Sequence, residues 1–172
     1  NYTVETHDGA GNSELYAVKD EIQDFTKLPY YANLNDKIKV TGDAGDTTSD
    51  YYVNYVGNGV WEECIAPNTS TGLDNSTMPH ILINNNDGTF TFAQQTYTER
   101  DAGDETTNPD PTFVTQTIQN LTFYKNRLGI LAGENLILSG NADYFNFFAT
   151  TVTQVLDTDV IDVNVAHTKV SI

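Results

Sequence analysis

The chain has 172 residues, of which 38% are apolar, and it carries 24 Asp and Glu against 8 Lys and Arg, a net charge of −16. Nucleic-acid binding depends on Lys and Arg that neutralise phosphates, so this composition argues against gripping DNA or an anionic membrane. Solubility alone also explains an acidic surface, and both explanations of the charge stay open. The apolar content is sufficient for a packed core.

The single cysteine, Cys64, rules out an intrachain disulfide and any paired-cysteine zinc pattern. It follows the letters VWEE and is expected to lie on a strand as a small apolar residue. No stretch approaches the roughly 20 apolar residues of a membrane helix, and the first residues lack the pattern of a signal peptide. The chain begins without Met and both ends resemble strands, so we expect a fragment of a longer protein.

In chain order, the first half predicts strands joined by tight turns, because Thr, Asn, Asp and Tyr favour those structures. One short helix is expected over residues 15–25, whose apolar side chains follow helical spacing between a capping Ser13 and Pro29. The letters GNG and NNNDG mark hairpin turns. Strands are predicted at residues 37–41, 50–56, 60–65, 80–84 and 89–94.

Residues 98–112 are polar, contain two prolines and show no period, which favours a domain junction or a long loop. The next residues predict short strands at 118–124, 128–132, 135–139 and 162–166, with a helical turn or aromatic corner in the letters NADYFNFF. Closely spaced short strands with tight turns are typical of one propeller blade, which needs neighbours to cover its faces.

We therefore expect a mainly β chain, of the β-rich α+β class, in three parts. Residues 1–97 form a hairpin-built module with the short helix, and residues 98–112 form a polar linker. Residues 113–172 form the opening strands of an incomplete propeller-like β domain.

Two acidic clusters are candidates for a calcium loop, because calcium prefers several hard oxygen ligands. Their carboxylates are Asp43, Asp46 and Asp50 in the first cluster, and Asp101, Asp104, Glu105 and Asp110 in the second. Neither cluster has the EF-hand spacing, and solvated turn carboxylates are commoner than metal ligands. These loops, the many Tyr and the β texture support one alternative function, a calcium-dependent carbohydrate-binding or depolymerising domain. No catalytic constellation or cofactor fingerprint is singled out, so we expect no enzyme and no cofactor.

The most patterned stretch of the chain is residues 123–148, FYKNRLGILAGENLILSGNADYFNFF. Arg127 lies between apolar strands, where its guanidinium must find acceptors, either turn carbonyls or a carboxylate such as Glu134. We favour a turn-locking role for this arginine over ligand contact. The remaining motif residues predict turns, blade core and a packed corner; they are Asn126, Gly129, Gly133, Glu134, Asn135, Tyr144, Phe145, Asn146, Phe147 and Phe148.

The second half of the chain closely resembles the nozzle, or tail tubular protein B, family of short-tailed phages. The family pattern runs TNPxPSF, FRNRLGFLSGENV, SR, YFNFF and DTDPIDVAVS. The chain matches it in the letters TNPDP and Phe113, in NRLG and GEN, in YFNFF, and in DTDVIDV from residue 157. The upstream letters VTGDAGDTTSDYYVNY, VWEE, STMPH and DGTFTF are also similar. The departures are Gly140 in place of Arg, Val160 in place of Pro, and Tyr124 in place of Phe.

The resemblance implies a structural role in the virion tail. Members of the family are several times longer than this chain. They form a homo-hexamer at the distal end of the tail, join an adaptor ring, support fibre attachment, and open or close the channel for the genome. No catalytic residues accompany that role. A DNA conduit works best without binding DNA, so we expect the acidic clusters to face the lumen of the ring.

Overall fold

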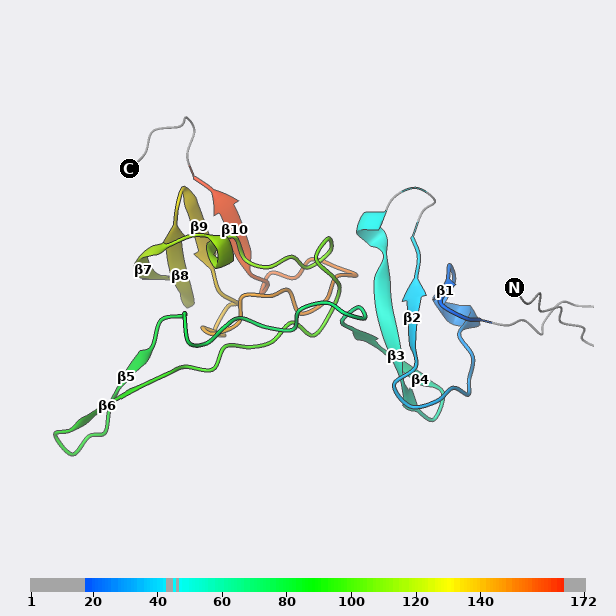
Figure 1. Ribbon diagram of the computed structural model, residues 1–172, viewed down its shortest axis with the longest axis horizontal. Helices are drawn as coiled ribbons and strands as arrows, with labels where there is room; N and C mark the ends of the chain where they lie inside the picture. The colour runs from blue at the N-terminus through cyan, green and yellow to red at the C-terminus, as the bar shows by residue number, and fades with distance from the viewer. Residues whose placement is uncertain (1–17, 43–44, 46, 166–172) are drawn as a thin grey trace, which may run out of the picture.

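The computed structural model describes residues 18–42, 45 and 47–165 (Figure 1). Over these residues the chain is mainly β, which confirms that part of the predicted class, and three short 3₁₀ turns are the helical elements found there. The strands form three separate sheets, and none of them closes on itself within the described residues. No helix in the described part of the chain is long and apolar enough to cross a membrane.

The first sheet has the order β1-β2-β3-β4, with β1 parallel to β2 and the other pairs antiparallel. Its strands are β1 (Glu21–Ile22), β2 (Lys37–Val40), β3 (Tyr51–Gly57) and β4 (Val60–Cys64). The turn between β3 and β4 places Asn58 and Gly59 at positive φ, as the letters GNG predict. Alternation along the strands buries one face, and its core consists of Ile38, Val40, Val53, Tyr55 and Trp61.

The predicted helix over residues 15–25 is wrong for its described part, and residues 15–17 lie outside the described residues. Glu21–Ile22 forms β1 instead, and η1 (Phe25–Lys27) is a 3₁₀ turn capped by the Asp24 side chain. The physical reason is the open edge of β2. The Lys39 N–H donates to the Asp20 carbonyl, and the Thr41 N–H donates to the Ile22 carbonyl. These ladder bonds place Ile22 against the core and override the helical spacing.

The second sheet has the order β10-β9-β8-β7 and is antiparallel throughout. Its strands are β7 (Ile118–Tyr124), β8 (Arg127–Ala132), β9 (Asn135–Leu138) and β10 (Ile161–Asn164), and η3 (Thr112–Thr115) precedes β7. The strands predicted for this part of the chain agree with these bounds to within one or two residues over the described range.

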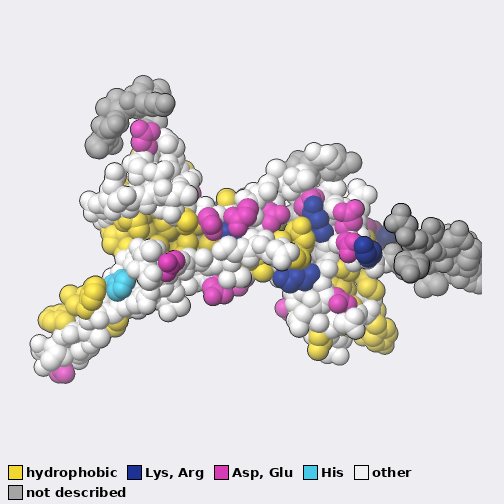
Figure 2. Space-filling view, viewed as in Figure 1, with side chains coloured by type: hydrophobic (Ala, Val, Ile, Leu, Met, Phe, Trp, Pro, Cys, Tyr) yellow, Lys and Arg dark blue, Asp and Glu magenta, His cyan; other side chains and the backbone are white. Residues whose placement is uncertain are grey.

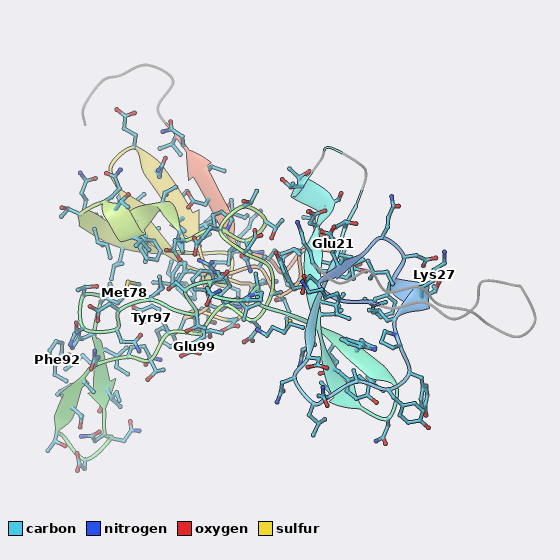
Figure 3. The ribbon with its side chains drawn as sticks, turned by 45° about the vertical axis from the view of Figure 1, so that its right-hand side comes forward. Glu21, Lys27, Met78, Phe92, Tyr97 and Glu99 are labelled. Carbon is cyan, nitrogen blue, oxygen red and sulfur yellow. The ribbon has the colours of Figure 1, made fainter. Side chains whose placement is uncertain are left out.

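One core lies against this sheet and draws on distant parts of the chain. Its buried members are Met78, Tyr97, Phe113, Ile130, Ala132, Ile137 and Phe147. Figure 3 shows Met78 and Tyr97 near one another, between the sheet and the hairpin described next. Two of these residues precede the segment 98–112 and the others follow it. The division of the chain at residues 98–112 stays a prediction, and any test of it has to account for this shared core.

The third sheet is the hairpin of β5 (Ile81–Asn84) and β6 (Phe90–Ala93). Its turn places Asn86 and Gly88 at positive φ, as the letters NNNDG predict. In Figure 1 the hairpin projects from one end of the long axis, while the first sheet occupies the other end. Figure 2 shows apolar side chains along the projecting arm.

Hydrogen bonds join the first sheet to the rest of the molecule. Both oxygens of the Glu63 carboxylate on β4 are engaged, one by the Thr151 hydroxyl at 2.5 Å and the other by the Val152 N–H at 2.8 Å. The Ala66 N–H donates to the Gly103 carbonyl at 2.8 Å, and the Gly103 N–H donates to the Cys64 carbonyl. Residues inside the predicted linker and residues after it therefore both contact the end of β4.

Candidate functional site

Arg127, at the start of β8, is the centre of a set of hydrogen bonds that we call the Arg127 lock. One terminal nitrogen of its guanidinium donates to the Ser139 carbonyl at 2.6 Å and the Asp159 carbonyl at 2.5 Å. The other donates to the Asp157 carbonyl at 2.8 Å. Arg127 is buried, so these bonds satisfy a charge that has left water. Of the two kinds of acceptor expected from the sequence, the structure shows backbone carbonyls, and they come from three separate positions.

Ser139 completes this lock from the end of β9. Its hydroxyl accepts the Leu128 N–H at 3.0 Å, and its own N–H donates to the Leu128 carbonyl at 2.8 Å. Ser139 is fully buried. The lock therefore joins β8, the end of β9 and the loop that leads into β10, so that one arginine fixes three segments of the sheet.

The motif glycines and asparagines occupy tight turns or close contacts. Asn126 and Gly133 have φ of 65° and 57°, at the β7–β8 and β8–β9 turns. A Cβ on Gly129 would lie 2.5 Å from the Thr122 methyl group, so only glycine lets β7 approach β8 here. Asn135 opens β9, and the Glu134 carbonyl accepts the Val165 N–H at 2.9 Å, beyond the end of β10.

Residues 144–148 form a packed aromatic corner. The Phe147 ring packs edge-on against Phe113 with centroids 5.2 Å apart, and Phe147 and Phe148 are both buried. The Asn146 side chain accepts the Phe148 N–H at 3.0 Å, which fixes the turn. The Tyr144 hydroxyl donates to the Asn126 side chain at 3.1 Å. This last bond connects the corner to the β7–β8 turn.

Arg100 is a second buried arginine, and the sequence analysis missed it. Its side chain is fully buried and donates to Glu105 at 2.7 Å and to Asp110. The guanidinium lies over the Phe148 ring, 5.0 Å from its centroid. The residue stands in a polar stretch without hydrophobic periodicity, so only the opposite charges five and ten residues later hinted at its burial.

The acidic calcium candidates occupy different places. Glu105 and Asp110 pair with Arg100, and Asp104 accepts the N–H groups of Thr106 and Thr107 in a turn. Burial raises the pKa of Asp104. The hydrogen bonds from these N–H groups and from the Thr107 hydroxyl lower the pKa by more than burial raises it, so the pKa of Asp104 is below its usual value. Asp101 is exposed.

Asp50, from the first cluster, is engaged by its own neighbours. It pairs with Lys39 at 2.5 Å and accepts the Gly42 N–H at 2.9 Å, and these contacts lower its pKa. Asp43 and Asp46 lie outside the described residues. Within the described ranges no group of three His, Cys, Asp or Glu side chains is placed to hold a metal ion.

Cys64 lies on β4, as expected, and is buried. Burial raises the pKa of its thiol, so it behaves as a small apolar residue at neutral pH.

Comparison with known proteins identifies the family. A family model described as the bacteriophage nozzle protein matches residues 1–172, the whole chain. The tail tubular protein gp12 of Escherichia phage T7 is 39% identical over 168 residues, which are 97% of this chain and 21% of that protein. The chain thus spans about a fifth of the length of that curated relative. These matches confirm the family resemblance drawn from the letters NRLG, GEN and YFNFF.

Proposed function

The chain belongs to the bacteriophage nozzle protein family and is part of a virion tail protein; on that premise we propose that it helps to build the distal nozzle ring of the tail tube. The ring is a homo-hexamer that attaches to an adaptor ring, supports tail fibres, and gates the channel through which genome DNA leaves. The role is structural, and it includes no catalytic step. The observation that carries the proposal is the family match over the full length of the chain.

The architecture of the described residues supports a structural role for the chain. Both buried arginines are used for internal locks, and the most patterned stretch of the chain builds turns and core. A protein that transmits load in a ring needs segments that hold their relative positions, and long-range hydrogen bonds of this kind provide them.

The acidic surface supports passage of DNA without binding. Figure 2 shows acidic side chains gathered over the middle of the molecule, between the first and second sheets. In the polar segment between β6 and η3, the exposed carboxylates include Glu99, Asp101 and Glu105. We propose that this band faces the lumen, where like charge repels the duplex and keeps it moving. An assembled ring whose lumen is neutral or basic, with these carboxylates on the outside, would contradict the proposal.

The second sheet supports a propeller-like domain in the longer protein. Ile130, Ala132 and Ile137 fill its core face. The register places Leu131, Leu136 and Val163 side by side on the opposite face, and Val163 is 43% exposed. A sheet that is apolar on both faces is typical of a blade between two neighbours. We propose that this sheet is the first blade and that the following part of the chain supplies the next.

Electron microscopy of the purified full-length protein tests the ring. The expected result is a closed particle with six-fold symmetry that joins to an adaptor ring when the two are mixed. A stable monomer at micromolar concentration, or an open filament, overturns the proposal. Phage particles that lack the protein but still carry a complete tail would overturn it as well.

A further inference from the structure

The β5–β6 hairpin exposes one apolar face. The register pairs Leu82 with Phe92 and Asn84 with Phe90, so these four side chains share a face. Leu82, Phe90 and Phe92 are 67%, 62% and 71% exposed. The His80 ring stacks on Phe92 with centroids 5.3 Å apart and extends the same face. Figure 3 shows Phe92 out on the arm, away from Met78 and Tyr97.

Among the described residues, neither strand of this hairpin pairs with a third strand, because its sheet contains β5 and β6 alone. A two-stranded sheet is marginally stable in water by itself. Three large apolar side chains on one face of such an arm therefore indicate an interaction surface.

A second apolar surface lies at the other end of the molecule, around the β3–β4 turn. Tyr30 and Tyr31 are 62% and 83% exposed, and their rings lie 4.8 Å apart. The Tyr30 ring covers Gly59, where a Cβ would lie 2.3 Å away. Exposed Val56 and Val60 flank the same turn, and a Cβ on Gly57 would lie 3.6 Å from the Leu34 side chain, which is also exposed. We call this set the tyrosine surface: Tyr30, Tyr31, Leu34, Val56 and Val60.

Both surfaces lie in segments of low charge. Copies of a chain with a net charge of −16 repel one another, so they meet best where charge is lowest. Residues 28–35 and 51–61, which hold the tyrosine surface, contain no charged residue. Residues 75–98, which hold the hairpin, contain one, Asp87. The other 23 of the 24 Asp and Glu residues lie outside these three segments.

We infer that the apolar face of the β5–β6 hairpin docks on the tyrosine surface of the next copy of the chain. The two surfaces are unlike and lie at opposite ends of the long axis (Figure 1). Contact between them is therefore head-to-tail, the kind of interface that closes into a ring when the rotation fits. The inference rests on the ring proposed above and assigns residues to its subunit contact.

A photo-crosslinker tests the contact in the full-length protein. Benzoylphenylalanine replaces Phe92, and the substituted protein is mixed with an isotopically labelled copy so that contacts between copies are recognised by mass. The expected crosslinks join position 92 of one copy to residues 30–34 or 56–60 of the other. Crosslinks to another part of the same copy, to a different protein, or to no partner in a ring that has formed, each overturn the inference.

Paired substitutions give an independent readout. Phe92→Ser and Tyr31→Ser are each expected to raise the protein concentration needed for half-assembly about tenfold or more. Their combination is expected to do little more than either alone, because both remove one contact. The matched control is Ile83→Ser, which removes an apolar side chain from the opposite face of the same hairpin. An unchanged midpoint for Phe92→Ser, additive effects, or an equal effect of the control overturns the inference.

The two proposals fail in different ways. Full six-fold rings without the crosslink, and with assembly unaffected by Phe92→Ser, remove the hairpin contact and leave the nozzle ring standing. A wild-type protein that forms no ring removes both.

Discussion

The β8–β9 hairpin and the β5–β6 hairpin have similar sequence patterns, but they lie in different surroundings. Both consist of short apolar strands joined by a turn that contains a glycine at positive φ. In the first, Ile130 and Ile137 are fully buried. In the second, Leu82 and Phe92 are mostly exposed. Alternation therefore determines that a hairpin forms, but what covers it depends on residues far away in the sequence.

The hydrogen bonds of the two hairpins differ in the same way. Around β8 and β9, Arg127 reaches carbonyls 12, 30 and 32 residues away. Around the β5–β6 turn, the side chains of Asn85 and Asp87 bond to residues two to six positions away. One hairpin is fixed by the tertiary structure, and the other is held by its own turn. The predictions below test this difference, from the largest expected effect to the smallest.

Arg127→Ala is expected to destabilise the protein by about 3–5 kcal/mol, because it leaves three carbonyl oxygens without their buried donor. The free energy of unfolding from a denaturant titration measures the loss. Lys125→Gln, two residues earlier in the exposed turn, serves as the control and is expected to change stability by less than about 0.5 kcal/mol. Equal values for the two variants would contradict the lock.

Ile130→Ala compares directly with Leu82→Ala. The first opens a cavity in the core of the second sheet and is expected to cost about 2–4 kcal/mol. The second truncates an exposed side chain and is expected to cost less than about 0.5 kcal/mol in the unassembled protein. Unfolding midpoints measured below the assembly concentration provide the comparison. A cost at Leu82 as large as that at Ile130 would mean that the hairpin is covered within its own chain.

Asp162→Ala tests a long-range tie to the edge strand β10. The Asp162 carboxylate accepts the Thr112 N–H and hydroxyl, both at 2.8 Å, across 50 residues of sequence. The site is exposed, so the expected loss is about 1 kcal/mol. Hydrogen exchange of the β10 amides gives a local readout and should speed up. Asp101→Ala, at another exposed carboxylate, is expected to leave those amides unchanged.

The smallest expected effect is the pH dependence of the hydrogen bonds that Asp87 accepts in the β5–β6 turn. Hydrogen bonds from the Thr89 hydroxyl and N–H hold the pKa of Asp87 below its usual value. A lowered carboxyl pKa means that the bonds stabilise the turn at neutral pH and are lost as the pH falls through the pKa in the folded protein. Carboxyl NMR titration should show this low pKa, and Thr89→Val should raise it towards the usual value. An unchanged pKa in the variant would contradict the assigned cause.

Local pattern was enough to predict most of the strands. Residues 118–124 were predicted as a strand with the bounds that the structure gives to β7, because turn residues border a β-branched and aromatic run. The stretch around Arg127 also contains turn residues, Asn126 and Gly133, between its apolar strands, so its two hairpins could be predicted.

What could not be predicted depends on distant partners. Residues 18–25 follow helical spacing, but the open edge of β2 pairs with Ile22 and makes a strand. Arg100 stands in a polar stretch, and its burial depends on Phe148 and on carboxylates brought together by folding. The three acceptors of Arg127 include two carbonyls from the loop before β10, which no local pattern points to.

The tie at Glu63 has a mechanical consequence. Its carboxylate holds a hydroxyl and an N–H from residues 151 and 152, and a charged acceptor makes both bonds stronger than neutral ones. A force that twists the first sheet away from the body loads both bonds, together with the backbone bonds that Gly103 makes with Cys64 and Ala66. Torque applied at one end of the molecule is therefore delivered to the loop between the aromatic corner and β10. Four hydrogen bonds thus share a load that the covalent chain would otherwise carry alone.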